Sequence, residues 1–222
     1  MIQSTGDLWC ALRANNAIIQ IMRETHKTQK SGSHINFPDL HLDDTYYMRE
    51  QMLADAQDFL NYYNTPEVSQ YILATIPSNL SQAEDELNYC RQLFYKSQGL
   101  YWAIAPQSTN QMIGSVGLDL NLQNHKAEIC YDLDQAYWNQ KIMSKALHAA
   151  ITLAFERLQL KRIEAIILKD NLASAKLLTK LGFQHEGTLR NYRYFNNTHH
   201  NIELYALIPE DFRWYSVKFY YK

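Results

Sequence analysis

DNLASAKLLTKLGF, residues 170–183, is the stretch that says most about the fold of this chain. Its apolar residues recur at the spacing of one helical face: Leu172, Ala175, Leu178 and Leu181. Asn171 stands where an N-terminal cap is expected, because Asn side chains accept hydrogen bonds from the first free amides of a helix. Gly182 follows the last periodic residue, and Gly enters the left-handed conformation that ends helices without steric cost. The stretch predicts a short helix between Asn171 and Gly182.

The segments around this helix predict alternating strands and helices. An Ile-rich strand, 162–168, precedes it, and a long helix, about 143–158, precedes that strand. Two strands follow, 183–191 and 202–207, separated by the polar turn 196–199. A strand that precedes the long helix would lie parallel to strand 162–168, because such crossovers join parallel neighbours.

The first half of the chain predicts helices followed by an antiparallel meander. Strands are expected at 45–48, 101–105, 112–120 and 127–133, and helices at 53–63 and from a Ser81/Glu84 capping box to about residue 96. Gly114 and Gly117 indicate a bulge or close packing in their strand. The predicted fold class is α/β, a mixed twisted sheet of about seven strands with about four helices.

Composition and length limit the class of protein. The chain has 222 residues, enough for one domain with an extension, and a net charge of −2, which does not favour nucleic acid as a partner. No apolar run approaches the roughly 18 residues of a membrane span, and no signal peptide is recognisable. The three cysteines, Cys10, Cys90 and Cys130, have no metal or redox spacing, so buried, reduced thiols in a cytoplasmic protein are expected.

The chain divides into an N-terminal extension, 1–40, and a main domain, 41–222. Apolar residues at near-helical spacing predict an amphipathic helix over Asp7–Thr25, and the polar segment 26–34 is typical of a linker. This helix would pack on the main domain or on a second copy of the chain, so a homodimer stays open.

The sequence AEICYDLDQAYWNQKIMSKAL, residues 127–147, resembles the cofactor loop of the GNAT N-acetyltransferases. The nearest branch contains the ribosomal-protein N-terminal acetyltransferases, where the stretch reads approximately AEIGYxLxxxxxGxGxxxxAL. RIEAIILKDNLASAKLLTKLGF (162–183) and HEGTLRNY (185–192) match the N-x-x-S…GF…EG-x-L-R pattern of the same branch. The resemblance covers about residues 46–207.

This resemblance implies an acyl-CoA N-acyltransferase fold whose sheet splays between strands 127–133 and 162–168. Acetyl-CoA would lie in the splay, with its pantetheine arm against the first strand and its pyrophosphate at the start of the long helix, where free amides and the helix dipole favour anions. The implied cofactor-binding residues are Tyr131, Leu133, Asn139, Gln140, Lys141, Ile142, Met143, Ser144 and Asn171.

The chain differs from the family pattern at three glycine positions. Asn139 and Lys141 replace the two loop glycines, and Cys130 replaces a strand glycine. Asn tolerates the left-handed region, whereas a left-handed Lys costs roughly 1–2 kcal/mol. Either Lys141 is left-handed and its side chain obstructs the site, or its backbone is right-handed and its ammonium pairs with a phosphate.

The family resemblance also implies roles in catalysis. Glu128 matches the strand glutamate that accepts a proton from the attacking amine, although an ordinary ion-paired carboxylate is an equal alternative. Ser174 would hydrogen-bond the departing thiolate, or else is a first-turn serine without a role in catalysis. Asn171 can bind the cofactor arm and cap its helix at once. His199 and His200 have no third ligand at useful spacing, so no metal is expected.

The sequence therefore predicts a cytoplasmic acyltransferase that moves acetyl from acetyl-CoA to a primary amine. By resemblance, the acceptor is a protein or peptide N-terminus. Two alternatives remain: a small-molecule amine as acceptor, and a non-catalytic binding module that kept the fold.

Overall fold

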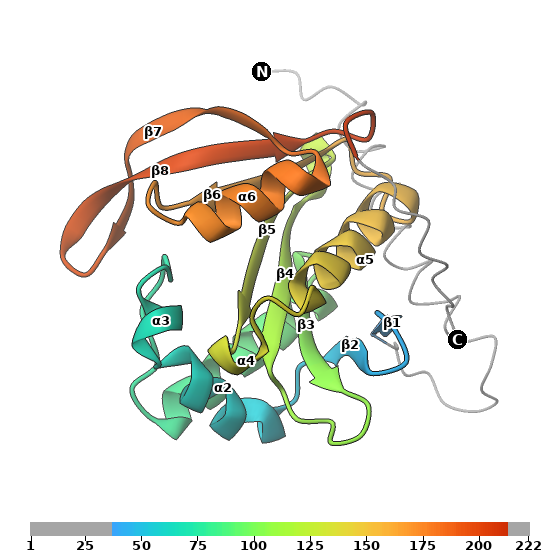
Figure 1. Cartoon of the computed structure of the whole chain (residues 1–222), viewed down its shortest axis with the longest axis vertical. Coiled ribbons are helices and arrows are strands. Elements are labelled where there is room, and N and C mark those ends of the chain that lie inside the picture. The colour runs from blue at the N-terminus through green and yellow to red at the C-terminus, as the bar shows by residue number, and fades with distance from the viewer. Residues whose placement is uncertain (1–36, 213–222) are drawn as a thin grey trace, which may run out of the picture.

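The computed structural model describes residues 37–212, which form one eight-stranded sheet with helices on both faces (Figure 1). The predicted helix Asp7–Thr25 and its linker lie outside these residues. The strands are β1 (Leu40–His41), β2 (Tyr46–Glu50), β3 (Gly99–Pro106), β4 (Gly114–Asn121), β5 (Lys126–Leu133), β6 (Arg162–Ile167), β7 (Gln184–Phe195) and β8 (Thr198–Leu207). The helices are α2 (Ala56–Tyr63), α3 (Pro66–Ser69), α4 (Leu80–Tyr95), α5 (Ile142–Glu156) and α6 (Leu172–Leu181).

The strand order is β1-β2-β3-β4-β5-β6-β8-β7, and every pair is antiparallel except β5 with β6. The predicted mixed sheet, its meander and its parallel crossover are confirmed. The parallel pair is joined through α5, as a crossover requires. The order also brings the last hairpin back beside β6, so that β7 and β8 curve over one end of the molecule (Figure 1).

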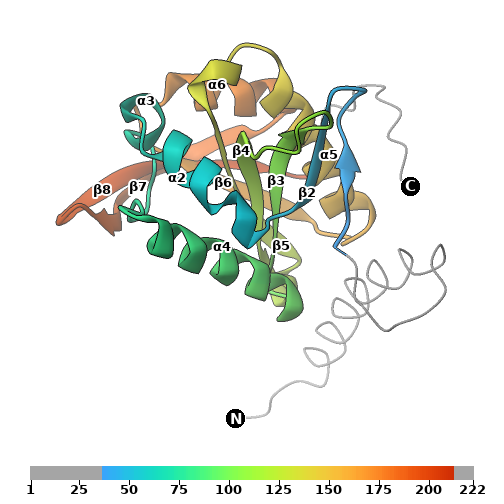
Figure 2. The same cartoon turned by 90° about the horizontal axis from the view of Figure 1, so that it is seen from below.

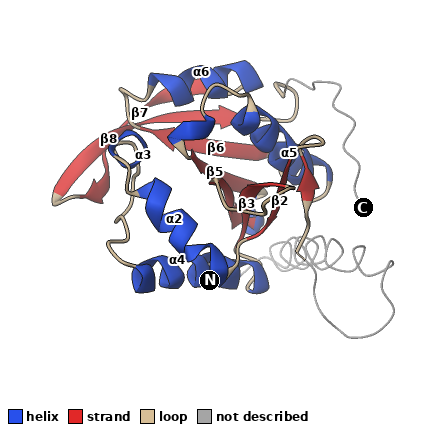
Figure 3. Ribbon diagram, turned by 60° about the horizontal axis from the view of Figure 1, so that its bottom comes forward, coloured by secondary structure: helices blue, strands red, loops and turns tan. Residues whose placement is uncertain are grey.

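The helices divide between the two faces of the sheet (Figures 2 and 3). α5 and α6 cover one face, and α2 and α4 cover the other. α5 is the central helix of the core and buries almost its whole surface, including its run of alanines. A second, smaller apolar cluster lies under α2 and α4. Within residues 37–212, no helix has the length and apolarity needed to cross a bilayer.

Three local details differ from or sharpen the prediction. Asn79, not Ser81, caps α4, and its side chain accepts a hydrogen bond from the Gln82 amide at 3.0 Å. Ser81 lies inside the first turn because the helix begins two residues earlier than predicted. Gly117 marks close packing rather than a bulge, since β3, β4 and β5 pair there in unbroken register. Gly182 is left-handed, as predicted, with φ of 105°.

Candidate active site

The sheet opens between its two parallel strands. β5 and β6 pair at only three positions, the last of which is Glu128 with Glu164. Beyond it β6 continues to pair with β8, while β5 continues to pair with β4, so the two strands diverge (Figure 1). Among residues 37–212, the main chain of residues 129–133 therefore has no strand partner on its β6 side. The splay expected from the resemblance is present.

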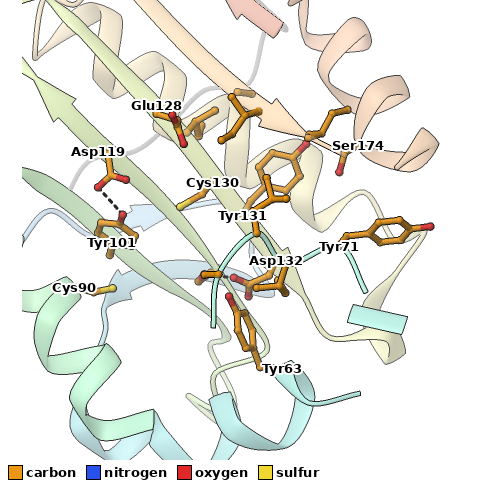
Figure 4. Close-up of a pocket in the computed structure, with 18 of the residues that line it drawn as sticks. Tyr63, Tyr71, Cys90, Tyr101, Asp119, Glu128, Cys130, Tyr131, Asp132 and Ser174 are labelled. Carbon is orange, nitrogen blue, oxygen red and sulfur yellow. Dashed lines mark hydrogen bonds between the residues drawn. The ribbon is translucent and has the colours of Figure 1, made fainter. Parts of the chain in front are cut away.

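A cavity of about 250 Å³ fills this splay. The residues that line it come from β3, β4, β5, β6, β7, α2, α4 and the N-terminal end of α6, together with Gln51 and the 71–74 segment. Of the predicted site residues, the lining includes Glu128, Tyr131, Asn171 and Ser174. Side chains of β5 point alternately to its two sides: in the close-up, Tyr131 points toward α6, while Cys130 points toward Tyr101 and Asp132 lies beside Tyr63 (Figure 4).

Glu128 stands at the vertex of the splay, at the last paired position of β5. The Arg193 guanidinium donates to Glu128 Oε1 at 3.2 Å, so this carboxylate is ion-paired, which is compatible with either of its two predicted roles. The carboxyl nevertheless lines the cavity. Its burial raises the pKa of Glu128, Arg193 lowers it, and the nearby Asp119 and Glu164 raise it further. An elevated pKa brings a carboxylate closer to the range in which it can accept a proton from an amine.

Asp132 is a second carboxyl on the same side of β5. Ser115 Oγ donates to it at 2.6 Å and Tyr62 OH at 2.7 Å. Burial raises the pKa of Asp132 to about 6, and the two hydroxyl donors partly offset that effect. Asp132 is not among the residues predicted from the sequence. The alternation of Glu128, Cys130 and Asp132 along one strand face is the signal that could have found it.

The prediction that Cys130 is buried was wrong. Its side chain is exposed in the cavity, whereas Cys90 is buried as predicted and Cys10 lies outside the described residues. Gly117 explains the environment of Cys130: a Cβ at position 117 would lie 2.3 Å from Tyr101 Cε1 and 2.6 Å from Cys130 Sγ. The Tyr101 ring therefore crosses the strand over Gly117, and its hydroxyl donates to Asp119 at 2.7 Å (Figure 4).

Tyr131 and Ser174 face each other on the α6 side of the cavity (Figure 4). The Tyr131 hydroxyl is buried and has no hydrogen-bond partner among residues 37–212. Burial raises the pKa of Tyr131, and the hydroxyl of Ser174 beside it lowers it in part. Two neutral hydroxyl groups thus lie together at the point where the two strands diverge.

Asn171 performs the capping role that was predicted for it. Its side chain accepts a hydrogen bond from the Ser174 amide at 3.1 Å, which fixes the first turn of α6. The same side chain lines the cavity, so capping and ligand contact are compatible at this position. By holding the turn that carries Ser174, Asn171 also fixes the position of that hydroxyl.

The loop before α5 keeps a glycine-like backbone without glycine. Asn139 and Lys141 are both left-handed, with φ of 61° and 62°. Of the two alternatives for Lys141, the backbone follows the left-handed one, and the side chain is exposed. Trp138 anchors the loop, because its Nε1 donates to the Leu133 carbonyl at 2.8 Å. Gln140 donates to the Ala136 carbonyl at 3.1 Å.

The first turn of α5 has no side-chain cap, in contrast to α4 and α6. The amides of Ile142, Met143 and Ser144 belong to this turn, while the side chains of Ile142 and Met143 are buried in the core. Uncapped amides at the N-terminus of a long helix suit a phosphate group. The contribution of Leu133, Ile142 and Met143 to any ligand would therefore come from their main chains.

Several residues that line the cavity were not predicted. Tyr63, Tyr71 and Tyr101 line it, whereas Tyr192, Tyr194 and Tyr205 of the β7–β8 hairpin do not. Tyr192 and Tyr194 are exposed on β7. Within residues 37–212, no group of three or more His, Cys, Asp or Glu side chains is arranged to hold a metal ion.

Comparison with known proteins gives consistent results. A family model described as an acetyltransferase (GNAT) domain matches residues 47–184. The N-acetyltransferase YoaA of Bacillus subtilis (strain 168), named as uncharacterized, is 31% identical over 166 residues, 74% of this chain and 94% of YoaA. The ribosomal-protein-serine acetyltransferase of Escherichia coli (strain K12) is 31% identical over 100 residues, 45% of this chain and 56% of that protein.

The fold is shared with solved acetyltransferase structures. The apo crystal structure of RimL, a ribosomal L7/L12 alpha-N-protein acetyltransferase, superposes with a TM-score of 0.71 and 22% sequence identity, covering 81% of this chain and 98% of RimL.

Proposed function

Because this chain belongs to the GNAT acetyltransferase family, it is an enzyme that transfers acetyl from acetyl-CoA to an amine, and we propose that its acceptor is a protein or peptide N-terminus. The observation that supports the proposal is the similarity to enzymes named for ribosomal proteins, combined with a cleft that residues of α2 and α4 line together with the Glu128 carboxyl. An N-terminal amine suits this cleft because its pKa of about 7.7–8.0 leaves roughly a tenth to a sixth of it neutral at pH 7, far more than of a lysine amine with a pKa of about 10.4.

The described residues fit acetyl-CoA in three respects. The left-handed backbone at Asn139 and Lys141 turns the loop toward the uncapped first turn of α5, where a pyrophosphate would meet free amides. The unpaired main chain of residues 131–133 is available to an extended pantetheine arm. Asn171 offers an amide group at the other side of the cleft.

In the proposed reaction, acetyl-CoA supplies the thioester carbon that the neutral amine attacks. Glu128 accepts the amine proton, directly or through a water molecule, and Arg193 keeps Glu128 ionised before the transfer. Ser174 donates a hydrogen bond to the sulfur as the thiolate leaves, and Tyr131 lies beside Ser174 where it can support that donor.

The test uses the full chain, acetyl-CoA and two matched peptides. One peptide has a free α-amino group and no lysine, and the other has a blocked N-terminus and one lysine. We expect CoA release and an acetyl group only on the first peptide. Acetylation of the lysine peptide or of small amines alone would contradict the proposed acceptor.

Two further predictions from the sequence belong to this proposal. The cytoplasm is the proposed compartment, and a homodimer formed through residues 1–40 remains a prediction that the described residues do not address.

A further inference from the structure

Acidic residues stand side by side on β4, β5 and β6, and two of them, Asp119 and Glu128, line the cavity. Asp119 on β4 is directly opposite Glu128 on β5, and Glu128 is directly opposite Glu164 on β6. Like charges at directly opposite positions destabilise a sheet unless something compensates them. This row of three acidic residues therefore requires positive charge nearby.

Protein cations compensate only part of the row. Arg193 pairs with Glu128 at 3.2 Å, and Lys126 and Arg162 pair with Glu164 at 2.8 Å and 2.7 Å. Asp119 accepts one hydrogen bond, from the neutral Tyr101 hydroxyl. Between Phe37 and Phe212, no Lys, Arg or His forms an ion pair with Asp119.

Two further carboxyls in the cavity lack a cation as well. Asp132 is hydrogen-bonded by neutral hydroxyl groups, and Glu86 on α4 has the Cys90 thiol as its hydrogen-bond donor, at 3.9 Å. Arg193 is the one basic side chain among the described residues that line the cavity, and it is already paired with Glu128. The α2–α4 side of the cleft therefore has an excess of negative charge.

An independent feature of the same cavity calls for a hydrogen-bond donor. Gln51 lines the cavity, is only 3% exposed, and its Oε1 has no hydrogen-bond partner within the described part of the chain. A buried amide oxygen without a partner costs about 1–3 kcal/mol, so a ligand N–H that reaches it would be favoured. Tyr63, Tyr71 and Tyr101 line the same space, and tyrosine faces attract cations.

We propose that this side of the cleft selects acceptors that carry a second positive charge close to the reacting amine, with Asp119 as its counter-ion. Given the proposed N-terminal acetylation, the second charge is a Lys or Arg side chain in the first residues of the acceptor. The identity of the reacting amine rests on the proposed function, whereas the requirement for a second positive charge does not. A linear polyamine carries the same chemistry without a peptide.

The test compares three peptides that differ only at the second residue: Lys, Gln or Glu. With the full chain and acetyl-CoA, we expect kcat/KM to fall from Lys to Gln to Glu, with about a tenfold difference between the extremes, because one charge contact in a cleft is worth about a factor of ten. The preference should weaken as salt is added. Equal rates for the three peptides would overturn the inference while leaving N-terminal acetylation intact.

Substitutions in the cavity identify the residues that cause the preference for a second positive charge. Asp119→Asn should reduce the preference for Lys over Glu by about fivefold, and Glu86→Gln should reduce it less. Asp85→Asn, on the exposed side of α4 and outside the cavity, is the matched control and should leave the ratio unchanged. A ratio that neither cavity variant alters would overturn the role of these carboxylates.

Testing spermidine, a linear polyamine, beside the peptides distinguishes the proposed N-terminal acceptor from the proposed requirement for a second charge. If spermidine is acetylated and no peptide is, the N-terminal acceptor is wrong and the requirement for a second charge stands. If neither is acetylated, both proposals fail.

Discussion

The two sides of the cleft bind their proposed ligands by different means. On the α5–α6 side, the groups available to acetyl-CoA are mainly main-chain amides, held by the left-handed loop and by the uncapped turn of α5. On the α2–α4 side, the available groups are side chains: carboxyls, tyrosines and Gln51. A main-chain site tolerates substitutions that preserve its dihedral angles, and Lys141 keeps the left-handed angle expected of a glycine. A side-chain site changes with each substitution, which suits the half of an enzyme that differs between substrates.

The most severe test of this division removes Glu128, the proposed base. Glu128→Gln should lower kcat about 100-fold, because a positioned general base contributes that much or more. Affinity for acetyl-CoA should change less than about twofold, since the cofactor side is built from other residues. Steady-state rates and calorimetric titration give the two numbers, and Glu84→Gln, exposed on α4, is the control. An unchanged rate would remove Glu128 from the mechanism.

The next-largest expected effect is on the pH dependence of stability, through the buried carboxyl of Asp132. Burial raises the pKa of Asp132 to about 6 from an ordinary 3.8, so the folded protein holds this proton more firmly than the unfolded chain does. The resulting stabilisation is complete below about pH 4 and is lost as the pH rises through 6. Relative to Asp132→Asn, the wild-type chain should lose about 2–3 kcal/mol of unfolding free energy between pH 4 and 7.

Urea unfolding at several pH values measures this difference. Taking the difference between the two chains cancels the opposite trend of carboxyls such as Glu164, whose ion pairs lower its pKa and stabilise the fold at higher pH. Parallel curves for the two chains would mean that Asp132 titrates normally.

A smaller effect separates capping from cofactor contact on the α6 side. Asn171→Ala should lose about 1 kcal/mol of stability with the N-cap, and should weaken acetyl-CoA binding about tenfold. Asn79→Ala is a matched control, because it removes the cap of α4 and leaves the cofactor side intact. Equal affinities in the two variants would reduce Asn171 to a structural residue.

The smallest expected change tests the main-chain character of the loop. Lys141→Gly should stabilise the fold by about 1 kcal/mol, because glycine is left-handed without strain. The dissociation constant of acetyl-CoA should shift by less than about threefold, since the amides stay in place. Asn139→Gly should stabilise less, because Asn already tolerates this region. Clearly tighter binding would mean that the lysine stem obstructs the site, and clearly weaker binding that its ammonium holds a phosphate.

The sequence predicts the α5–α6 side better than the other side, and the reason is physical. Gly182, the Asn171 cap and the apolar period of α6 are local signals, so they can be read from neighbouring residues. The parallel crossover follows from general rules of chain connection.

The acceptor side depends on contacts between distant segments. Tyr101 and Cys130 are 29 positions apart in the chain and meet over Gly117 only because three strands share one register. The exposure of Cys130 follows from the space beneath α4, which no local pattern indicates. The choice of Asn79 over Ser81 as the cap of α4 depends on a two-residue shift that either side chain allows.

The bare backbone at Gly117 has a consequence for redesign of this enzyme. Because the Tyr101 ring occupies the volume that any larger residue there would need, even Gly117→Ala must displace the ring and release its hold on Asp119. One nucleotide change that introduces a methyl group would therefore alter the depth and the charge of the acceptor pocket together. Libraries that seek new acceptors should vary position 117 jointly with Tyr101, since neither is free to change alone.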